Sequence, residues 1–433
     1  MREKIVLIGA GSAMFTRGLV ADLLGRGWDT ELALVDTDPR ALAVAQGLTA
    51  KMIAAKGARV RLTASTDRRR VLRGATAVVC TVGVGGRRAW LKDVTIPRKY
   101  GIYQPVGDSV MPGGTSRALR MIPAMVGVAR DVLALAPKAL FFNYGNPMGP
   151  VCRAIRKATN APVTGLCHGV NDVAHTLAGA LGVPFADFSY AAIGMNHCTW
   201  FVDVRIKGRD AMPRLRRIAE HKRYDWFSWQ CVTLFGAFPA CMDRHVTEFF
   251  PQFFRDGTYK KHRLGITEYS LERTIGWGDK IFADMKRDAA GSRPLPADYF
   301  DRIGGEHEQV LDIVESIRRG DGKTYSANLP NGNRVPSLPC DAILEGPCVA
   351  TRAGLRAAPV PPLSSGLAGT LATRLQWVEC VVEAALEGSR TKFIQALVLD
   401  GACPSLEVAH RLADDLLQAQ RAYLPQFRHG KSS

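Results

Sequence analysis

The segment Ile5-Val6-Leu7-Ile8-Gly9-Ala10-Gly11-Ser12 decides the fold at the start of the chain. Four apolar residues in a row, without polar alternation, are typical of a strand that is buried on both faces of a sheet. The glycines that follow indicate a tight turn, and residues 15–24 have the pattern of a helix. A strand, a glycine turn and a helix in this order predict the first unit of a doubly wound sheet.

Strand and helix patterns keep alternating as far as residue 195. Further strands are predicted at 31–36, 76–82, 138–143, 163–166 and 191–193, with helices at 41–56 and 119–135. Strands separated by helical segments pair in parallel through right-handed crossovers. We therefore predict an α/β fold with a Rossmann-like, doubly wound, mostly parallel sheet.

The character of the sequence changes after Asn196. Aromatic residues cluster at 224–229, helical patterns span 305–318 and 371–386, and residues 328–334 and 359–362 are predicted to be loops. We predict a Rossmann-like domain over residues 1–195 and a mainly helical α+β domain over residues 196–433.

The composition excludes several classes of protein. The 433 residues are 47% hydrophobic and 22% charged, which excludes a disordered or fibrous chain. The net charge of +17 fits an anionic ligand, but the basic residues are dispersed, without a basic run interleaved with aromatics. We expect no nucleic-acid partner. No stretch of about 18 residues is both uncharged and consistently apolar, so we also expect no membrane span.

The cysteines point to a reducing compartment. There are ten in 433 residues, none forms a CxxC pair, and no signal-peptide pattern precedes the first strand. We expect reduced thiols and a cytoplasmic protein.

The glycine turn predicts a dinucleotide site. Gly9 and Gly11 follow the first strand, Ser12 follows them, and Met14 stands where the third glycine of the usual fingerprint would be. Asp36 ends the second strand, where a carboxylate can bind the ribose and would repel a 2′-phosphate, so NAD is favoured over NADP. Gly83, at the end of the third strand, belongs to the same predicted site. The predicted dinucleotide site therefore consists of Gly9, Gly11, Ser12, Asp36 and Gly83. An ordinary glycine turn and a solvated Asp36 are the alternatives.

Two strand ends further along carry polar residues that suit a ligand. Asn143 and Asn146 follow the fourth strand, where an amide could bind a sugar hydroxyl, although Asn-Pro is also a common turn. Cys167 ends the fifth strand and His197 follows the sixth, and together they would make an open, two-ligand metal site. A buried thiol and a core histidine are the alternatives.

A titratable cluster lies in the second half. Within residues 239–248, Asp243 and His245 are candidate general bases, because proximity shifts pKa values apart. A plain surface charge run is the alternative, although the flanking phenylalanines favour partial burial.

Taken together, these motifs identify the chain as similar to glycoside hydrolase family 4, the glycosidases that depend on NAD and a divalent metal. The resemblance covers nearly the whole chain and includes the turn without a third glycine. The shared motifs are Gly9-x-Gly11-Ser12, Gly107-Asp108-Ser109, residues 113–120, residues 143–148, Cys167-His168-Gly169-Val170, Asn196-His197, Gly305-Glu306-His307 and residues 328–332.

The resemblance implies an unusual mechanism without a pair of catalytic carboxylates. Hydride passes from C3 of the sugar to NAD+, which acidifies the proton on C2. A base removes that proton while the metal, expected to be Mn2+ or another divalent ion, stabilises the enolate. The glycosidic oxygen leaves by elimination, water adds to C1, and the hydride returns to C3.

Roles carry over from the family residue by residue. Cys167 and His197 resemble the metal ligands, Asn146 resembles a substrate-binding residue, and His168 lies where relatives place a candidate acid for the leaving group. Some relatives use a tyrosine as the C2 base, but none occupies residues 238–250 here. Asp243 is our first candidate for this base and His245 our second. Asp108 and Arg117 match positions near the pocket, with loop capping and a solvated helix charge as their alternatives.

The residue after Cys167-His168 indicates the substrate class. Cys-His-Gly resembles the α-glucuronidases and α-galacturonidases. Gly169 leaves space near C5 of the sugar and removes a carboxylate that would repel a uronate, and Arg244 could pair with that uronate. We therefore expect a glycosidase acting on α-galacturonides or α-glucuronides, with substrate bound by Asn146, Asp108, Arg117 and Arg244. The resemblance also suggests a homodimer or homotetramer.

Other functions remain open at this stage. An α-galactosidase or α-glucosidase of the same family is the nearest. An NAD-dependent 2-hydroxy-acid dehydrogenase shares the fold type, although the chain length and the Cys167/His197 pair argue against it. A cofactor-sensing or nucleic-acid-binding protein is the non-enzymatic alternative.

Overall fold

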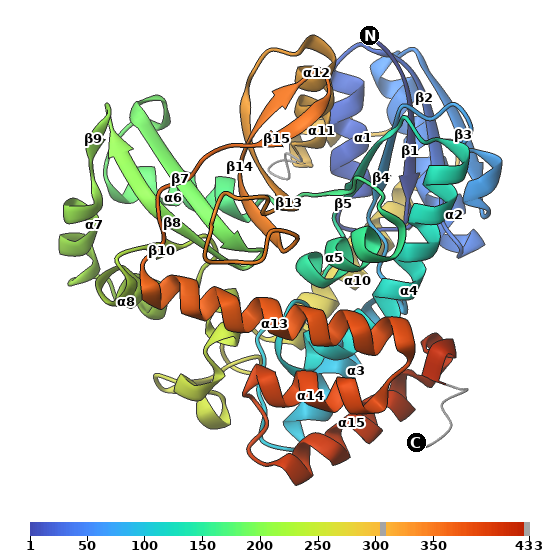
Figure 1. Cartoon of the computed structure of the whole chain (residues 1–433). Coiled ribbons are helices and arrows are strands. Elements are labelled where there is room, and N and C mark those ends of the chain that lie inside the picture. Colours follow the sequence, from blue (N-terminus) through green and yellow to red (C-terminus); the bar gives the residue numbers. More distant parts are fainter. Residues whose placement is uncertain (304–308, 428–433) are drawn as a thin grey trace.

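A computed structural model describes residues 1–303 and 309–427 of the chain. Among these residues, 13 strands join one twisted sheet with helices on both faces, and a second, two-stranded sheet is formed by β11 (Thr258–Tyr259) and β12 (His262–Arg263) (Figure 1). The main sheet runs in the order β10-β8-β7-β14-β13-β6-β5-β4-β1-β2-β3, and β9 and β15 pair with β8 and β14. This architecture confirms the predicted α/β class.

The N-terminal half of the sheet is parallel. Its order, β3-β2-β1-β4-β5-β6, is that of a Rossmann fold, and each of these neighbours pairs in parallel. The strands are β1 (Arg2–Ile8), β2 (Asp29–Val35), β3 (Val60–Ser65), β4 (Ala77–Cys80), β5 (Leu140–Asn143) and β6 (Thr164–Gly165). The helices of this half are α1 (Thr16–Gly25), α2 (Pro39–Lys56), α3 (Gly86–Arg98), α4 (Met111–Leu135), α5 (Met148–Thr159) and α6 (Gly169–Ala180).

The sheet continues into the second half of the chain with antiparallel strands. These are β7 (Phe188–Met195), β8 (Cys198–Ile206), β9 (Arg209–Asp210), β10 (Phe238–Pro239), β13 (Thr324–Pro330), β14 (Ile343–Thr351) and β15 (Gly354–Ala357). The prediction of a mainly helical second half missed most of them. Residues 328–330 were predicted as part of a loop, but they lie in β13. Polar side chains such as that of Asn328 suggested a loop, whereas in the fold this side chain is fully buried and donates to the carbonyl oxygen of Gly165.

Helices form the rest of the second half. They are α7 (Met212–Ala219), α8 (Trp226–Phe235), α9 (Asp243–Val246), α10 (Leu271–Ala289), α11 (Tyr299–Arg302), α12 (Val310–Arg319), α13 (Ser365–Glu387), α14 (Arg390–Asp400) and α15 (Leu406–Gln420). The predicted helix at 371–386 lies within α13, whose Trp377 is fully buried. The start of the helix predicted at 305–318, and the motif Gly305-Glu306-His307, lie outside the described residues.

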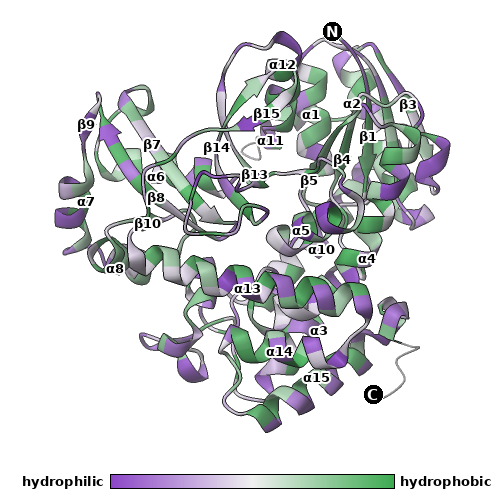
Figure 2. Ribbon diagram, in the orientation of Figure 1, coloured by the Kyte–Doolittle hydropathy of each residue, from purple (hydrophilic) through white to green (hydrophobic). Residues whose placement is uncertain are grey.

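The core lies on both faces of the sheet. Figure 2 shows hydrophobic residues concentrated on the central strands and on the inner sides of the helices, with hydrophilic residues outside. The ribbon of α13 runs beneath the sheet and packs on α4 and α5, so the C-terminal helices cover the lower end of the parallel, N-terminal half (Figure 1). This packing brings the C-terminal helices close to the loops that follow the parallel strands.

The two halves share one continuous sheet. Residue 195 is the last residue of β7, which pairs along its length with β8. The domain boundary predicted there falls in a tight connection between paired strands, and the division into two domains stays a prediction. Within the described residues, no helix is long and apolar enough to cross a membrane.

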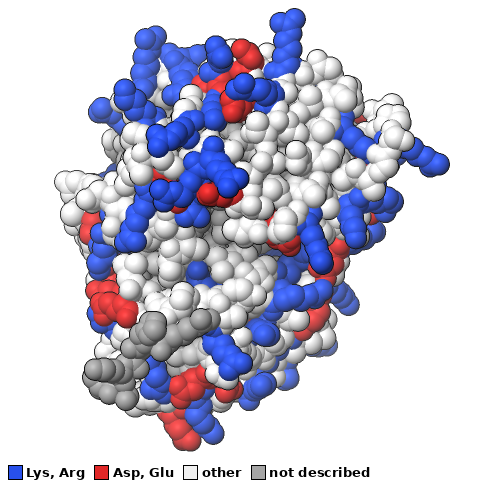
Figure 3. Space-filling model, turned by 90° about the vertical axis from the view of Figure 1, so that its right-hand side faces the viewer, with Lys and Arg blue, Asp and Glu red and all other residues white. Residues whose placement is uncertain are grey.

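Basic residues are spread over the outer face of the parallel, N-terminal half. Figure 3 shows Lys and Arg side chains across this face, in several places beside acidic ones. Arg68 and Arg69 share Asp131, and Arg61 pairs with Glu31. Part of the positive charge is therefore balanced locally.

Candidate active site

The glycine turn after β1 has the tight geometry that the sequence predicts. Gly9 has a φ of +94°, and a Cβ atom there would lie 2.8 Å from the backbone of Thr81. The Gly11 N–H donates to Oδ2 of Asp36 at 2.7 Å, which fixes that carboxylate at the end of β2. Ser12 Oγ accepts from the Met14 N–H at 3.3 Å, and α1 begins at Thr16, so an irregular turn separates the glycines from the helix.

Two of the predicted ligands face each other. Cys167 follows β6 and His197 follows β7, and Cys167 Sγ lies 3.8 Å from His197 Nε2. His197 is 9% exposed and has a φ of +144°, a backbone conformation that is costly for a residue with a side chain. The Cys241 thiol donates to the carbonyl oxygen of His197 at 2.6 Å, which helps to hold this turn.

Hydrogen bonding fixes the tautomer of His197. Ser109 Oγ donates its one proton to Asp108 Oδ1 at 2.7 Å and also contacts His197 Nδ1 at 2.9 Å. Since that proton is already donated, the second contact requires the N–H to be on Nδ1 of the imidazole. His197 Nε2 then has a free lone pair on the side of Cys167, as a metal ligand requires.

Asp108 and His245 complete the cluster. A ligand atom of each lies within 4.8 Å of the other and of His197, and the rings of His197 and His245 have centroids 4.4 Å apart. The Asn146 side-chain amide donates to Asp108 Oδ2 at 2.9 Å, and Arg117 Nε donates to the carbonyl oxygen of Asn146 at 3.0 Å. Together with Cys167, the structure thus brings six predicted residues together in one place.

The charges in this cluster suit a cation. Burial alone would raise the pKa of Asp108, but His197, His245 and Arg117 lower it to about 2, so Asp108 is an anion. Burial, followed by the neighbouring His197, lowers the pKa of His245 to about 3, so its imidazole is neutral. Burial also lowers the pKa of His197. A carboxylate, two neutral imidazoles and a nearby thiol form a donor set that Mn2+ or Zn2+ can bind.

Asp243, by contrast, lies in a closed polar environment. It is fully buried, and its carboxylate accepts from the N–H groups of Phe227 and Ser228, from the Ser228 hydroxyl and from the Tyr259 hydroxyl. Four donors fill the acceptor positions of its two oxygens. This geometry gives Asp243 the role of tying α8, α9 and β11 together and leaves it no free oxygen for a substrate proton.

The remaining predicted residues lie around the cluster. The His168 side chain is 55% exposed and lies 3.7 Å from Asp172. Arg244 Nη2 donates to the Thr274 hydroxyl at 3.1 Å, whereas its buried Nε has no hydrogen-bond partner among the described residues. A Cβ on the exposed Gly83 would lie 3.8 Å from the guanidinium of Arg117, so Arg117 adjoins both the turn after β4 and the cluster.

Sequence reasoning assigned no role to two residues that shape the site. Ser109 connects Asp108 to His197, and Glu248 accepts hydrogen bonds from the loop before Asp108. The motif Gly107-Asp108-Ser109 contained the first of these. The signal for Glu248 was a carboxylate among phenylalanines, which predicts burial, and it is 1% exposed.

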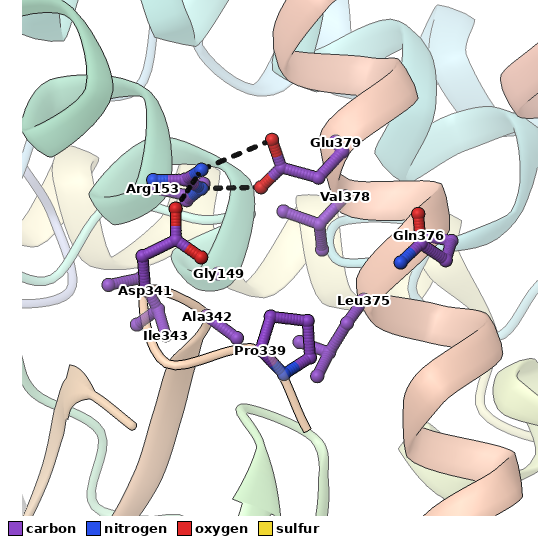
Figure 4. Close-up of a pocket in the computed structure, with 10 residues that line it drawn as sticks. All are labelled: Gly149, Arg153, Pro339, Asp341, Ala342, Ile343, Leu375, Gln376, Val378 and Glu379. Carbon is purple, nitrogen blue, oxygen red and sulfur yellow. Dashed lines mark hydrogen bonds and ion pairs between the residues drawn. The ribbon is translucent and has the colours of Figure 1, made fainter. Parts of the chain in front are cut away.

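A separate pocket lies between α5, α13 and residues 339–343 (Figure 4). Arg153 on its wall forms ion pairs with Asp341 and Glu379, so its charge is already balanced. The pocket contains none of the predicted site residues.

The fold and the site define a class of protein: a Rossmann-type nucleotide-binding enzyme with a cluster of metal-binding side chains at the strand ends. The sequence model described as "Family 4 glycosyl hydrolase" matches residues 4–183, and the model of the "Family 4 glycosyl hydrolase C-terminal domain" matches residues 192–403. The chain belongs to glycosyl hydrolase family 4.

Individual relatives agree with this assignment. The chain is 31% identical over 449 residues to an α-galactosidase of Rhizobium meliloti (strain 1021), which covers 98% of this chain and 90% of that protein. It is 27% identical over 458 residues to an α-galacturonidase of Lachnoclostridium phytofermentans, covering 98% and 97%. A solved 6-phospho-α-glucosidase from gut microorganisms, in complex with NAD and Mn2+, has a TM-score of 0.84 at 17% identity and covers 99% and 100% of the two chains. At that identity the structural match shows the common fold alone.

Proposed function

We propose that this chain hydrolyses α-glycosides of uronic acids, with NAD+ and a divalent metal such as Mn2+. The observation that carries the proposal is that the cofactor turn and the polar cluster lie at one edge of one sheet. Gly9, Gly83, Asn146 and Cys167 follow β1, β4, β5 and β6, which are parallel, so all four strand ends face the same side. A dinucleotide bound at Gly9 would extend toward the cluster.

The metal would be held by this chain's own side chains. Cys167 Sγ and His197 Nε2 are its proposed protein ligands, and the Asp108 carboxylate, within 4.8 Å of a His197 ring nitrogen, could be a further ligand. NAD+, when bound, supplies reversible hydride abstraction at the sugar. Proteins of the same fold have been solved with NAD and Mn2+, which is consistent with both groups. Asp36 and the turn of Gly9, Gly11 and Ser12 would hold the adenosine side of NAD.

His245 replaces Asp243 as our candidate for the base that takes the C2 proton. Its imidazole lies beside that of His197, and its buried Nδ1 has no hydrogen-bond partner among the described residues. This nitrogen is therefore available to accept a proton, whereas the carboxylate of Asp243 has no free acceptor position. His168, exposed beside Cys167, remains the proposed acid for the leaving group.

Two residues support an acidic substrate. Arg244 is next to the proposed base and forms no ion pair with a carboxylate in the described part of the chain, so its guanidinium could bind a uronate. A Cβ on Gly169 would lie 3.2 Å from the carbonyl oxygen of Ala240 and 3.6 Å from Cys167 Sγ. Any larger side chain there would therefore lie beside the metal ligand. Asn146 and Arg117 would orient the sugar through Asp108.

A neutral sugar is the second candidate. The specific observation in its favour is that the α-galactosidase relative is 31% identical, whereas the α-galacturonidase is 27% identical. The homodimer or homotetramer and the cytoplasmic location expected from the sequence stay predictions.

The test is release of nitrophenol from four aryl α-glycosides: galacturonide, glucuronide, galactoside and glucoside. The protein is treated with chelator and a thiol reductant, and NAD+ and Mn2+ are added separately and together. We expect hydrolysis of a uronide only when both are present. Hydrolysis of a neutral glycoside alone would refute the uronate proposal, and NADH accumulating without hydrolysis would indicate a dehydrogenase.

Arg244→Ala tests the acidic specificity directly. We expect KM for the uronide to rise about 10-fold or more, as loss of a charge-assisted hydrogen bond predicts, with little change for a neutral glycoside. Arg273→Ala, which removes an exposed arginine of α10, is the matched control. An unchanged KM in Arg244→Ala would remove this residue from the substrate site.

A further inference from the structure

The loop that carries Asp108 is held by side chains rather than by its own backbone. Among the described residues, no backbone–backbone hydrogen bond involves residues 103–109. Such a loop needs other partners, because buried backbone groups without hydrogen bonds are costly. Asp108 and Ser109 on this loop set the position and tautomer of His197, so whatever holds the loop also holds the site.

Glu248 supplies the first support. Its Oε1 accepts from the N–H groups of Val106 and Gly107 at 2.7 and 2.8 Å. Glu248 is 1% exposed and lies three residues after His245, in the short helix that continues α9. One side chain thus links the segment of the proposed base to the loop of Asp108.

Asp400 supplies the second support, just beyond the loop, at the first residue of α4. Asp400 is the last residue of α14, and its Oδ2 accepts from the Met111 N–H at 2.8 Å. Met111 has a φ of +59°, a conformation that favours glycine, so it needs such a contact to persist.

Arg374 of α13 closes the ring. Its guanidinium donates to Asp400 Oδ2 at 3.4 Å and to the carbonyl oxygen of Phe249, the residue after Glu248. Arg374 is 6% exposed and Asp400 2%. The chain of contacts therefore runs from the loop through Glu248 to Phe249, then through Arg374 and Asp400 back to the loop.

We propose that Glu248, Arg374 and Asp400 are positioning residues, through which the C-terminal helices fix the distance between the loop of Asp108 and the segment of His245. The expected effect on kcat rests on the proposed function. The expected effect on the position of the Asp108 loop does not depend on it. Mutation of polar side chains that orient a ligand-bearing segment is expected to lower metal affinity or activity about 10- to 100-fold.

The discriminating variants are Glu248→Met and Glu248→Gln. Methionine has a similar size but accepts no strong hydrogen bond, so it frees both amides. The side-chain oxygen of glutamine can take the place of Glu248 Oε1 and accept the hydrogen bonds from both amides. We expect Glu248→Met to lower kcat about 10- to 100-fold with a smaller change in KM, and Glu248→Gln to restore most of the activity. Glu248→Asp, shorter by one methylene, serves if the methionine variant does not fold.

Hydrogen exchange gives a readout that does not depend on activity. In Glu248→Met the amides of Val106 and Gly107 should exchange faster, whereas the Gly113 amide, held by Gln104, should not. The Mn2+ affinity should fall in parallel. Glu3→Met is the matched control, because Glu3 is also a buried carboxylate but pairs with Arg318 away from the site. It should lower the melting temperature without affecting kcat of the folded enzyme.

The outcomes separate the two proposals. A folded Glu248→Met variant with normal kcat, normal Mn2+ affinity and unchanged exchange at residues 106 and 107 would overturn the positioning role. If the wild-type chain hydrolyses none of the glycosides, the proposed function fails, while exchange and Mn2+ affinity still decide whether Glu248 holds the loop. Equal losses in Glu248→Met and Glu248→Gln would also overturn it, because the hydrogen-bond acceptor is common to glutamate and glutamine.

Discussion

The glycine turn after β1 and the cluster of Asp108, His197 and His245 lie at the same edge of the sheet, but they are built in different ways. The turn is local: Gly9, Gly11 and Asp36 directly follow two adjacent strands, β1 and β2. The cluster draws one residue from each of three segments that lie far apart along the chain. A local motif can be recognised by spacing alone, whereas a cluster of this kind depends on contacts formed by the whole fold. The two should therefore respond independently to mutation.

The largest effect should come from the metal ligands. Cys167→Ser and His197→Ala should lower activity by about 1000-fold or more, because a bound metal supplies several kcal/mol of transition-state stabilisation. Electron paramagnetic resonance of Mn2+ should show loss of binding, while NADH fluorescence shows an unchanged affinity for the dinucleotide. Cys340→Ser, at an exposed cysteine, is the control. Retained activity in Cys167→Ser would refute its role.

The second comparison sets His245 against Asp243. His245→Ala should lower kcat by about 100- to 10,000-fold, as loss of a general base does, and should abolish incorporation of solvent deuterium at C2. Asp243→Asn should instead lower the free energy of unfolding by about 2–4 kcal/mol, because the amide faces donors that the carboxylate satisfied. Denaturant unfolding and kcat of the folded protein distinguish the two.

The base and a metal ligand can also be told apart at position 245. If His245 is the base, His245→Ala retains most of its Mn2+ affinity. If Mn2+ binding is lost together with activity, His245 is a third ligand of the metal, and the proton acceptor is another group.

A smaller effect should come from the glycine turn. A Cβ on Gly11 would lie 2.6 Å from Ala41 Cβ and 2.7 Å from Asp36 Oδ2, so Gly11→Ala must displace one of them. The dissociation constant of NAD+ should rise roughly 10- to 100-fold, the equivalent of the 1–3 kcal/mol that overpacking costs. Mn2+ affinity should not change. Gly25→Ala, where a Cβ meets nothing within 4 Å, is the control.

The contrast also explains what the sequence could predict. Strands β1, β4 and β5 contain continuous apolar runs, so their pattern identifies them, and β1 and β2 overlap the predicted strands. The parallel strand β3, with the sequence VRLTAS, alternates polar and apolar residues and was not predicted. The antiparallel strands β13 and β14 were missed because they carry the buried polar residues Asn328 and Glu345. The Glu345 carboxylate accepts hydrogen bonds from the side-chain amides of Asn328 and Asn196. Burial of such polar groups follows from tertiary contacts, which no local pattern reveals.

The candidate site shows the same division. Cys167 and His197 could be named from motifs at strand ends, and the structure places them 3.8 Å apart. The sequence ranked Asp243 above His245 as the candidate base, and we reverse this order because their environments in the fold differ, although only Arg244 lies between them. Four donors surround Asp243, while a buried nitrogen of His245 has no partner among the described residues. Only the assembled fold distinguishes a structural carboxylate from a candidate base.

The last prediction is a pH dependence of stability that separates Glu248 from its glutamine variant. Burial raises the pKa of Glu248 to about 8, against hydrogen bonds from Val106 and Gly107 that lower it. The folded state therefore keeps a proton that the unfolded chain releases near its ordinary pKa of 4.5. Between these two values the folded protein binds more protons, so the contribution of Glu248 to stability falls as the pH rises.

Glutamine does not titrate, so the difference in unfolding free energy between wild type and Glu248→Gln isolates this group. The difference should be constant below pH 4.5. Between pH 4.5 and about pH 8 the unfolding free energy of the wild type should fall, relative to that of Glu248→Gln, by at most about 1.4 kcal/mol per pH unit, and above this range the difference should level off. Urea unfolding at several pH values measures it, and all other carboxylates cancel. A difference that stays flat, or that moves in favour of the wild type, would mean that Glu248 is ionised in the folded protein and that the loop of Asp108 is held by a full negative charge.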